Sequence, residues 1–201
     1  MKFYRFVIKL ISPLVKLFLR VKIVDLRSTK ELPERTIICA NHLSNWDPVL
    51  TVVATGLPIN FMAKESLFRV PVLKNIIRAF GAFPVSKSGQ DTSAIKKAIE
   101  IIKSGGCFSL FPQGTRLHIE PQAEQAKKGV GFICAKAESG VLPVGIYTKD
   151  YKIKLFRKIT VTIGDVIKFE DIDFGPDGKD YLNASQHIFG KICDLVKLEK
   201  K

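Results

Sequence analysis

The sequence predicts an α/β domain with a mostly parallel or mixed central sheet flanked by helices, preceded by an N-terminal amphipathic helical segment. Short β-branched or apolar runs alternate with helix-length segments along most of the 201 residues, which is the pattern of chains that build helices around one sheet. No internal repeat and no linker rich in Pro, Gly or Ser divides the chain. We therefore expect an N-terminal segment over residues 1–22 and a single domain over residues 23–201.

Seven short apolar runs are expected as strands: Lys22–Leu26, Arg35–Ala40, Ile59–Ala63, Ala82–Val85, Cys107–Phe111, Leu142–Tyr147 and Lys158–Ile163. Five segments are expected as helices: Pro48–Thr55, Val72–Phe80, Thr92–Lys103, Lys128–Glu138 and Asp180–Lys197. Open α/β sheets carry their sites at strand ends, so polar residues that directly follow strands are the first candidates for function.

Composition excludes some classes of protein and favours some partners. A hydrophobic fraction of 46% and a charged fraction of 25% exclude disordered and collagen-like chains. The formal net charge of +13 favours anionic partners such as nucleic acid, anionic lipid or phosphorylated metabolites. The four cysteines are scattered without a CxxC pair, which indicates buried free thiols in a reducing, intracellular setting and neither a metal site nor a disulfide framework.

The segment of residues 1–22 is basic and amphipathic. It contains six basic residues and no acidic one, and on a helix five of the six fall within a sector about 60° wide. Apolar side chains occupy the other faces, and Pro13 is expected to kink or divide the helix. A narrow basic stripe beside a broad apolar face is typical of a helix that lies in a membrane interface.

Three other interpretations of this segment are less favoured than membrane docking. A membrane-spanning helix is disfavoured, because Lys9 and Lys16 interrupt the apolar run and charges are costly near the bilayer centre. A signal peptide is disfavoured because basic residues run throughout and no small-residue cleavage site follows. The third is an amphipathic helix that packs on its own domain with a solvated basic face.

The first candidate site follows the strand around residues 36–40, in the run Asn41-His42-Leu43-Ser44-Asn45-Trp46-Asp47-Pro48. Asp47-Pro48 fits a helix N-cap followed by a proline-favoured position. If a turn brings them together, Asp47 can fix the tautomer of His42 and leave its other nitrogen free to accept a proton. No GxSxG nucleophile is present, so such a pair suits a transferase that deprotonates a substrate hydroxyl. An ordinary helix cap would use the same residues.

The second candidate site follows the strand of residues 107–111, in the run Phe111-Pro112-Gln113-Gly114-Thr115-Arg116. Gly114 permits a tight turn. Its backbone N–H, the Thr115 hydroxyl and the forked guanidinium of Arg116 are suitable donors to a phosphate. The alternative is a surface turn that carries a solvated arginine.

Together these two blocks resemble the glycerolipid acyltransferases, especially the bacterial type of 1-acyl-sn-glycerol-3-phosphate (lysophosphatidic acid) acyltransferase. Further blocks occur in the family's order: Lys64-Glu65-Ser66-Leu67 with Pro71, then Gly81-Ala82-Phe83-Pro84-Val85-Ser86-Lys87, and finally Val141-Leu142-Pro143-Val144-Gly145-Ile146. The resemblance covers most of the chain.

The resemblance implies a role for each matching residue. His42 would be the general base and Asp47 would orient it, while Gly114, Thr115 and Arg116 would hold the acceptor's phosphate with support from Lys87; Lys64 and Gln113 are secondary candidates. Two positions depart from the family's pattern. Gln113 stands where glutamate is usual, which removes a charge but keeps hydrogen-bonding capacity. Ser86-Lys87 stands where aspartate-arginine is common, which keeps a positive charge but loses bidentate geometry.

The expected function is transfer of an acyl group from acyl carrier protein or coenzyme A to the free hydroxyl of a lysophospholipid, with no resident cofactor and no metal. The expected acceptor is 1-acylglycerol-3-phosphate, which would give phosphatidic acid; another lysophospholipid or a lyso-aminolipid is the alternative. The expected location is the cytoplasmic face of the cell membrane, where the protein would bind the anionic surface as a peripheral or monotopic protein. A non-enzymatic basic module that binds lipid or nucleic acid is the alternative class, although we expect no nucleic-acid partner.

Overall fold

A computed structural model describes residues 2–86 and 92–200, and its centre is a seven-stranded sheet with the order β1-β7-β6-β2-β5-β3-β4. The strands are β1 Val21–Asp25, β2 Thr36–Ala40, β3 Ile59–Lys64, β4 Ala82–Val85, β5 Cys107–Leu110, β6 Gly140–Thr148 and β7 Ile159–Ile163. All neighbours pair in parallel except β6 and β7. The sheet is therefore mixed, within the fold class that the sequence predicts.

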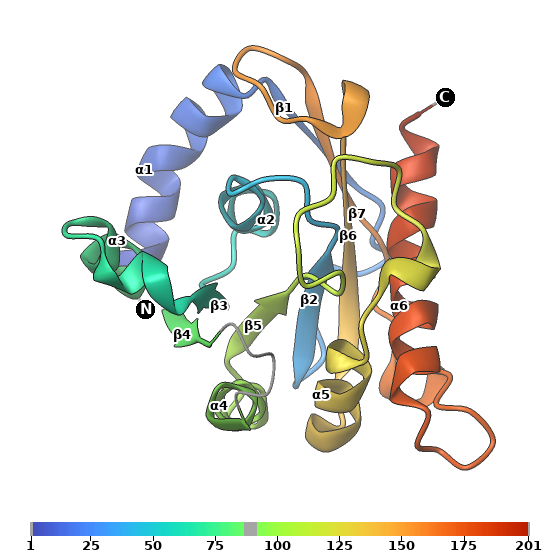
Figure 1. The fold of residues 1–201 in the computed structure, drawn as a ribbon. Coiled ribbons are helices and arrows are strands. Elements are labelled where there is room, and N and C mark those ends of the chain that lie inside the picture. Colours follow the sequence, from blue (N-terminus) through green and yellow to red (C-terminus); the bar gives the residue numbers. More distant parts are fainter. Residues whose placement is uncertain (1, 87–91, 201) are drawn as a thin grey trace.

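The helices lie on both faces of the sheet (Figure 1). They are α1 Lys2–Phe18, α2 Asp47–Thr55, α3 Leu73–Ala79, α4 Thr92–Lys103, α5 Gly129–Ala137 and α6 Tyr181–Leu198, with 3-10 turns at Glu65–Arg69, Ala123–Gln125, Lys149–Tyr151 and Phe169–Asp171. Side chains of α1 and α2 pack into one buried cluster, and those of α4, α5 and α6 pack into another.

Strand β2 separates these two clusters at the centre of the sheet. All five of its residues are buried, because successive side chains point to opposite faces and both faces are covered. Ile37 and Cys39 face the cluster with α4, α5 and α6, whereas Ile38 and Ala40 face the cluster with α1 and α2. The carboxyl end of β2 therefore lies in the middle of the sheet, between β6 and β5.

Helix α1 packs on the domain with one face and leaves another apolar face exposed. One face packs on the domain: Ile8 is buried, Tyr4 and Val15 contact the same cluster, and the Tyr4 hydroxyl donates to the Ile59 carbonyl at 3.1 Å. A second face is apolar but exposed, and we call it the α1 ridge; its members are Phe6 64%, Leu10 63%, Leu14 55% and Leu17 67% exposed.

The basic stripe of α1 lies beside this ridge, with Lys9, Lys16 and Arg20 exposed; the side chains of Lys2 and Arg5 lie outside the described part. Contrary to one expectation, Pro13 does not divide α1, which runs unbroken from Lys2 to Phe18. Strand β1 begins at Val21, two residues before the domain start expected from the sequence. None of the described helices has the length and apolar run needed to cross a bilayer.

Candidate active site

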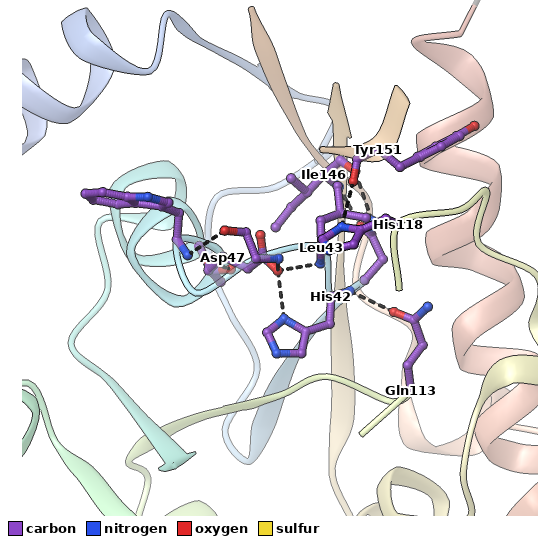
Figure 2. Close-up of polar contacts among 11 residues, drawn as sticks. His42, Leu43, Asp47, Gln113, His118, Ile146 and Tyr151 are labelled. Atoms are coloured by element: carbon purple, nitrogen blue, oxygen red, sulfur yellow. Dashed lines mark hydrogen bonds and ion pairs between the residues drawn. The ribbon is translucent and has the colours of Figure 1, made fainter. Parts of the chain in front are cut away.

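His42 and Asp47 meet where β2 ends and α2 begins. The chain leaves the buried strand at Asn41 and turns through residues 43–46 into the helix, so the two side chains are brought together across a turn, as the sequence analysis required. His42 Nδ1 lies 2.7 Å from Asp47 Oδ2. Figure 2 shows the imidazole below Asp47, with its far edge directed away from the carboxylate.

Asp47 is fixed by three hydrogen bonds to one oxygen. Besides His42, the backbone N–H groups of Leu43 and Ser44 donate to Oδ2 at 2.6 and 2.7 Å, and the residue is fully buried. The expectation that Asp47 is an N-cap is wrong in detail: it is the first residue of α2, and the cap position is Trp46. The carboxylate instead turns back onto the preceding loop, because two loop N–H groups and the imidazole converge on it there.

Asn41 continues the pairing of the sheet beyond the end of β2. Its side-chain amide donates to the Ile146 carbonyl at 2.9 Å and its oxygen accepts from the Ile146 N–H at 2.7 Å. The side chain is fully buried, so it satisfies two backbone groups of β6 that would otherwise lack partners. The next residue, His42, leaves the sheet from a fixed point.

Contacts with Phe111 and Gln113 also hold His42 in place. Its ring stacks on Phe111 with centroids 4.2 Å apart and planes 13° from parallel. Its backbone N–H donates to Gln113 Oε1 at 2.7 Å, as Figure 2 shows. The side chain is 18% exposed, and no partner is recorded for Nε2 among the described residues. Nδ1 faces the carboxylate, so Nε2 is the nitrogen available to a substrate.

Gln113 contributes to this site by holding the backbone of His42. It is 2% exposed, and its amide nitrogen donates to Gln125 Oε1 at 2.9 Å. Both ends of the Gln113 amide are thus used, one as acceptor and one as donor. A glutamate could accept from His42 but could not donate to Gln125. Glutamine at this position can therefore make both hydrogen bonds, to the His42 N–H and to Gln125 Oε1.

The turn after β5 carries the residues expected to bind phosphate. Gly114 adopts φ +65°, a conformation that glycine adopts without strain. Gly114, Thr115 and Arg116 are all exposed, and no carboxylate pairs with Arg116 within the described ranges. The turn follows Gln113 directly and lies beside His42.

Lys127 lies against this turn, although it is not among the site residues that the sequence predicts. Its ammonium nitrogen is 3.4 Å from the position that a Cβ on Gly114 would occupy. Its backbone N–H donates to the Pro112 carbonyl at 2.9 Å. The pair Lys127-Lys128 directly before α5 was the available signal, but nothing local in the sequence shows that the loop folds back onto Gly114.

The remaining candidates lie at the same edge of the sheet or outside the described residues. Lys64 ends β3, which runs parallel to β5, and its side chain is exposed. It is thus at the carboxyl edge, but β5 separates its strand from β2. Lys87 lies outside the described residues.

The cysteines are free thiols. Burial raises the pKa of Cys39 well above its ordinary value, and burial raises the pKa of Cys134 to about 12. Both thiols are therefore held in the neutral form that packs as a small apolar side chain. Among the described residues, no group of three or more His, Cys, Asp or Glu side chains is arranged to hold a metal ion.

Comparison with known proteins places this geometry in a family. Residues 21–147 match the model of the Acyltransferase family. The chain belongs to this family. The match begins with β1 and ends in β6, so it includes both strand ends that carry the candidate site residues.

Related acyltransferases share part of the sequence. The chain is 31% identical over 153 residues to the 1-acyl-sn-glycerol-3-phosphate acyltransferase of Streptococcus pneumoniae, with 72% of this chain and 56% of that protein covered. It is 28% identical over 139 residues to the protein of the same name from Borreliella burgdorferi, with 67% and 55% covered. The chain thus spans just over half the length of these two relatives.

A third relative and a solved structure match at greater length. The 1-acyl-sn-glycerol-3-phosphate acyltransferase of Bacillus subtilis is 26% identical over 163 residues, which cover 79% of this chain and 80% of that protein. The crystal structure of the 1-acyl-sn-glycerophosphate (LPA) acyltransferase PlsC from Thermotoga maritima superposes with a TM-score of 0.75 at 25% identity, covering 99% of this chain and 82% of that one. The acyltransferase fold thus extends over nearly the whole chain.

Proposed function

We propose that this chain transfers an acyl group from a thioester, either acyl carrier protein or acyl-coenzyme A, to the free hydroxyl of 1-acylglycerol-3-phosphate to give phosphatidic acid. The observation that carries the proposal is the pair His42 and Asp47, joined at 2.7 Å, with no partner for Nε2 of the histidine in the described part of the chain. The names of the relatives support the choice of acceptor.

The reaction needs one base and no covalent enzyme intermediate. Nε2 of His42 accepts the proton of the acceptor hydroxyl as its oxygen attacks the thioester carbonyl carbon. Asp47 stabilises the imidazolium that forms, since a buried carboxylate lies against the other ring nitrogen. The C–S bond then breaks, and the thiolate leaves as a thiol after taking the proton from His42. General-base catalysis of this kind contributes about 10²–10⁴-fold to the rate.

The phosphate of the acceptor is proposed to bind at the Gly114 turn. Arg116, which follows the turn, and Lys127, which lies against it, supply positive charge. The exposed backbone of Gly114 and the Thr115 hydroxyl supply hydrogen-bond donors. Charge-assisted hydrogen bonds to phosphate are the strong class of such bonds. Lys87 is proposed to support the same anion.

The α1 ridge is proposed to dock on the anionic cytoplasmic face of the cell membrane. Its exposed side chains, Phe6, Leu10, Leu14 and Leu17, lie beside the basic Lys9 and Lys16. Apolar side chains flanked by lysines bind an anionic bilayer through apolar burial and charge attraction. Docking in this way would bring the active site to an acceptor lipid that resides in the bilayer.

The test is transfer of a labelled acyl group from each donor to 1-acylglycerol-3-phosphate in anionic vesicles, comparing the unaltered chain, His42→Ala and His118→Ala. His118 is a matched control because it is an exposed histidine whose Nδ1 lies 3.3 Å from the Tyr151 carbonyl oxygen. We expect transfer by the unaltered chain and by His118→Ala, and loss of transfer in a folded His42→Ala variant. Transfer that persists in His42→Ala would refute the assigned base.

A panel of other lysophospholipids and a lyso-aminolipid tests the acceptor. Gln113 and Lys87, which depart from the family's pattern, are the reason to include them. Faster transfer to one of these lipids than to 1-acylglycerol-3-phosphate would replace the proposed acceptor but keep the reaction. Failure of every acceptor with both donors would refute the acyltransferase activity itself.

A further inference from the structure

The segment between β6 and β7, residues 149–158, carries two large apolar side chains that face water. Leu155 and Phe156 are each 61% exposed. Two other apolar residues of the same segment, Tyr151 and Ile153, pack against the buried cluster on the α1 side of the sheet. The segment is thus anchored by one pair of apolar side chains and leaves a second pair outside.

The exposed pair is continuous with α1. In Figure 1 the segment, drawn in orange, reaches over to the C-terminal end of α1. The Phe156 N–H donates to the Phe18 carbonyl at 2.8 Å, and the two rings lie with centroids 6.0 Å apart. Phe18 follows Leu17 of the α1 ridge and is itself 47% exposed. The apolar surface of the helix therefore continues onto the loop.

The charge of the segment complements an anionic surface. Residues 149–158 contain five basic residues and one acidic residue. Arg157 is engaged internally, since it donates to the Lys149 carbonyl at 3.0 Å and to Asp150 at 3.2 Å. Lys152, Lys154 and Lys158 are exposed, and in the described part of the chain no carboxylate lies within ion-pair distance of them.

From these observations we infer that residues 149–158 form a second membrane-contacting element, which inserts Leu155 and Phe156 into an anionic bilayer while Lys152, Lys154 and Lys158 contact lipid phosphates. Apolar side chains that project from a basic loop suit a bilayer better than a folded partner, which would need a matching concave surface. With α1, the loop provides a second point of contact, so that the molecule is held in one orientation at the surface. The inference rests on the proposed membrane association of the enzyme.

The first experiment measures sedimentation of the full chain with vesicles of phosphatidylglycerol and phosphatidylcholine. The variant is Leu155→Ser/Phe156→Ser, and the matched control is Leu182→Ser/Leu198→Ser, which removes two apolar side chains of α6 that are 46% and 54% exposed. Losing two inserted apolar side chains is expected to weaken partitioning about tenfold or more, with the α1 ridge still providing residual binding. The control is expected to bind as the unaltered chain does. Equal binding by the variant and the unaltered chain would overturn the inference, provided that thermal unfolding shows both to be folded.

The second experiment reports where the loop goes. Trp46 is the sole tryptophan, so Trp46→Phe/Phe156→Trp carries a single probe at the loop and Trp46→Phe/Leu182→Trp carries one on α6. Brominated lipid is expected to quench the first probe and not the second. The inference would be overturned if brominated lipid quenched neither probe. It would also be overturned if the fluorescence of the loop probe changed with acyl carrier protein and not with vesicles.

Separate experiments test the proposed acyl transfer and the proposed membrane contact of residues 149–158. Acyl transfer by the unaltered chain to short-chain 1-acylglycerol-3-phosphate dispersed in detergent is measured without vesicles. Its absence would refute the proposed function, while the sedimentation and quenching results would still decide whether the loop contacts lipid.

Discussion

Replacing Asp47 by asparagine removes a charge at the centre of the proposed site and changes little else in shape. In the native chain one carboxylate oxygen accepts from the imidazole and from two loop N–H groups at 2.6–2.7 Å, in a fully buried position. The carbonyl of an asparagine can still accept from the two N–H groups. It cannot supply the negative charge that stabilises an imidazolium.

The loss of rate follows from that charge. Two unit charges about 4 Å apart attract by about 4 kcal/mol at an effective dielectric constant of about 20, which corresponds to about a thousandfold in rate. General-base catalysis as a whole contributes about 10²–10⁴-fold, so a loss of about 10³-fold in kcat is the expected result. The free energy of unfolding is expected to fall by only about 1–3 kcal/mol, because charged hydrogen bonds become neutral ones.

The assay is the initial rate of thiol release from acyl-coenzyme A with 1-acylglycerol-3-phosphate as acceptor, at saturating concentrations of both. Asp165→Asn is the control, since Asp165 also accepts from a backbone N–H and a hydroxyl, those of Ser28 at 2.7 and 2.8 Å, but is exposed. We expect the control to keep the native kcat. An Asp47→Asn variant that unfolds normally and keeps more than about a tenth of the native kcat would refute the role given to this carboxylate.

Three other predictions concern the phosphate turn, the support of His42 and the attachment of α1. Lys127→Met should raise KM for the phosphate acceptor about tenfold to a hundredfold through loss of a charged hydrogen bond. Lys128→Met should raise it less. Equal increases in KM for the two variants in steady-state kinetics would refute the placement of Lys127 at the phosphate site. Gln113→Leu should lower the free energy of unfolding by about 1–3 kcal/mol, since it leaves a backbone N–H without its partner, whereas Gln113→Glu should unfold closer to the native midpoint in urea. Burial raises the pKa of Tyr4 to about 12, so the folded chain holds this proton more tightly than the unfolded chain, whose phenol titrates near pH 10. The stability from Tyr4 is therefore complete below about pH 10 and is lost as the pH rises toward 12; urea unfolding of Tyr4→Phe should lose less stability over that range, and an equal loss would contradict the assignment.

The fold and the contact between His42 and Asp47 could be predicted from the sequence because their signals are local. Strands such as β2 are short apolar runs bounded by polar residues, and each observed helix other than α1 lies within about two residues of an expected segment. His42 and Asp47 are five residues apart, so a single turn decides whether they meet. That turn is encoded by the residues between them and by the helix that starts at Asp47.

Contacts between distant segments could not be predicted in this way. Lys127 reaches Gly114 because the loop of residues 115–126 folds back, and Gln113 contacts Gln125 through the same loop. The pattern of α1 did not show which apolar face would pack on the domain and which would stay exposed, because both are apolar. Tyr4 and Ile8 pack inward because the domain, built from residues far along the chain, lies on that side.

The side chain of Asn41 has a consequence for which sequences this fold can tolerate. It acts as a surrogate peptide group, because it offers one donor and one acceptor to Ile146 just as a neighbouring strand would. Aspartate offers only acceptors, and glutamine carries the same amide on a longer stem. In a library randomised at position 41 and selected for enzymatic activity, asparagine should therefore be recovered almost alone, even though it contributes no atom to the chemistry.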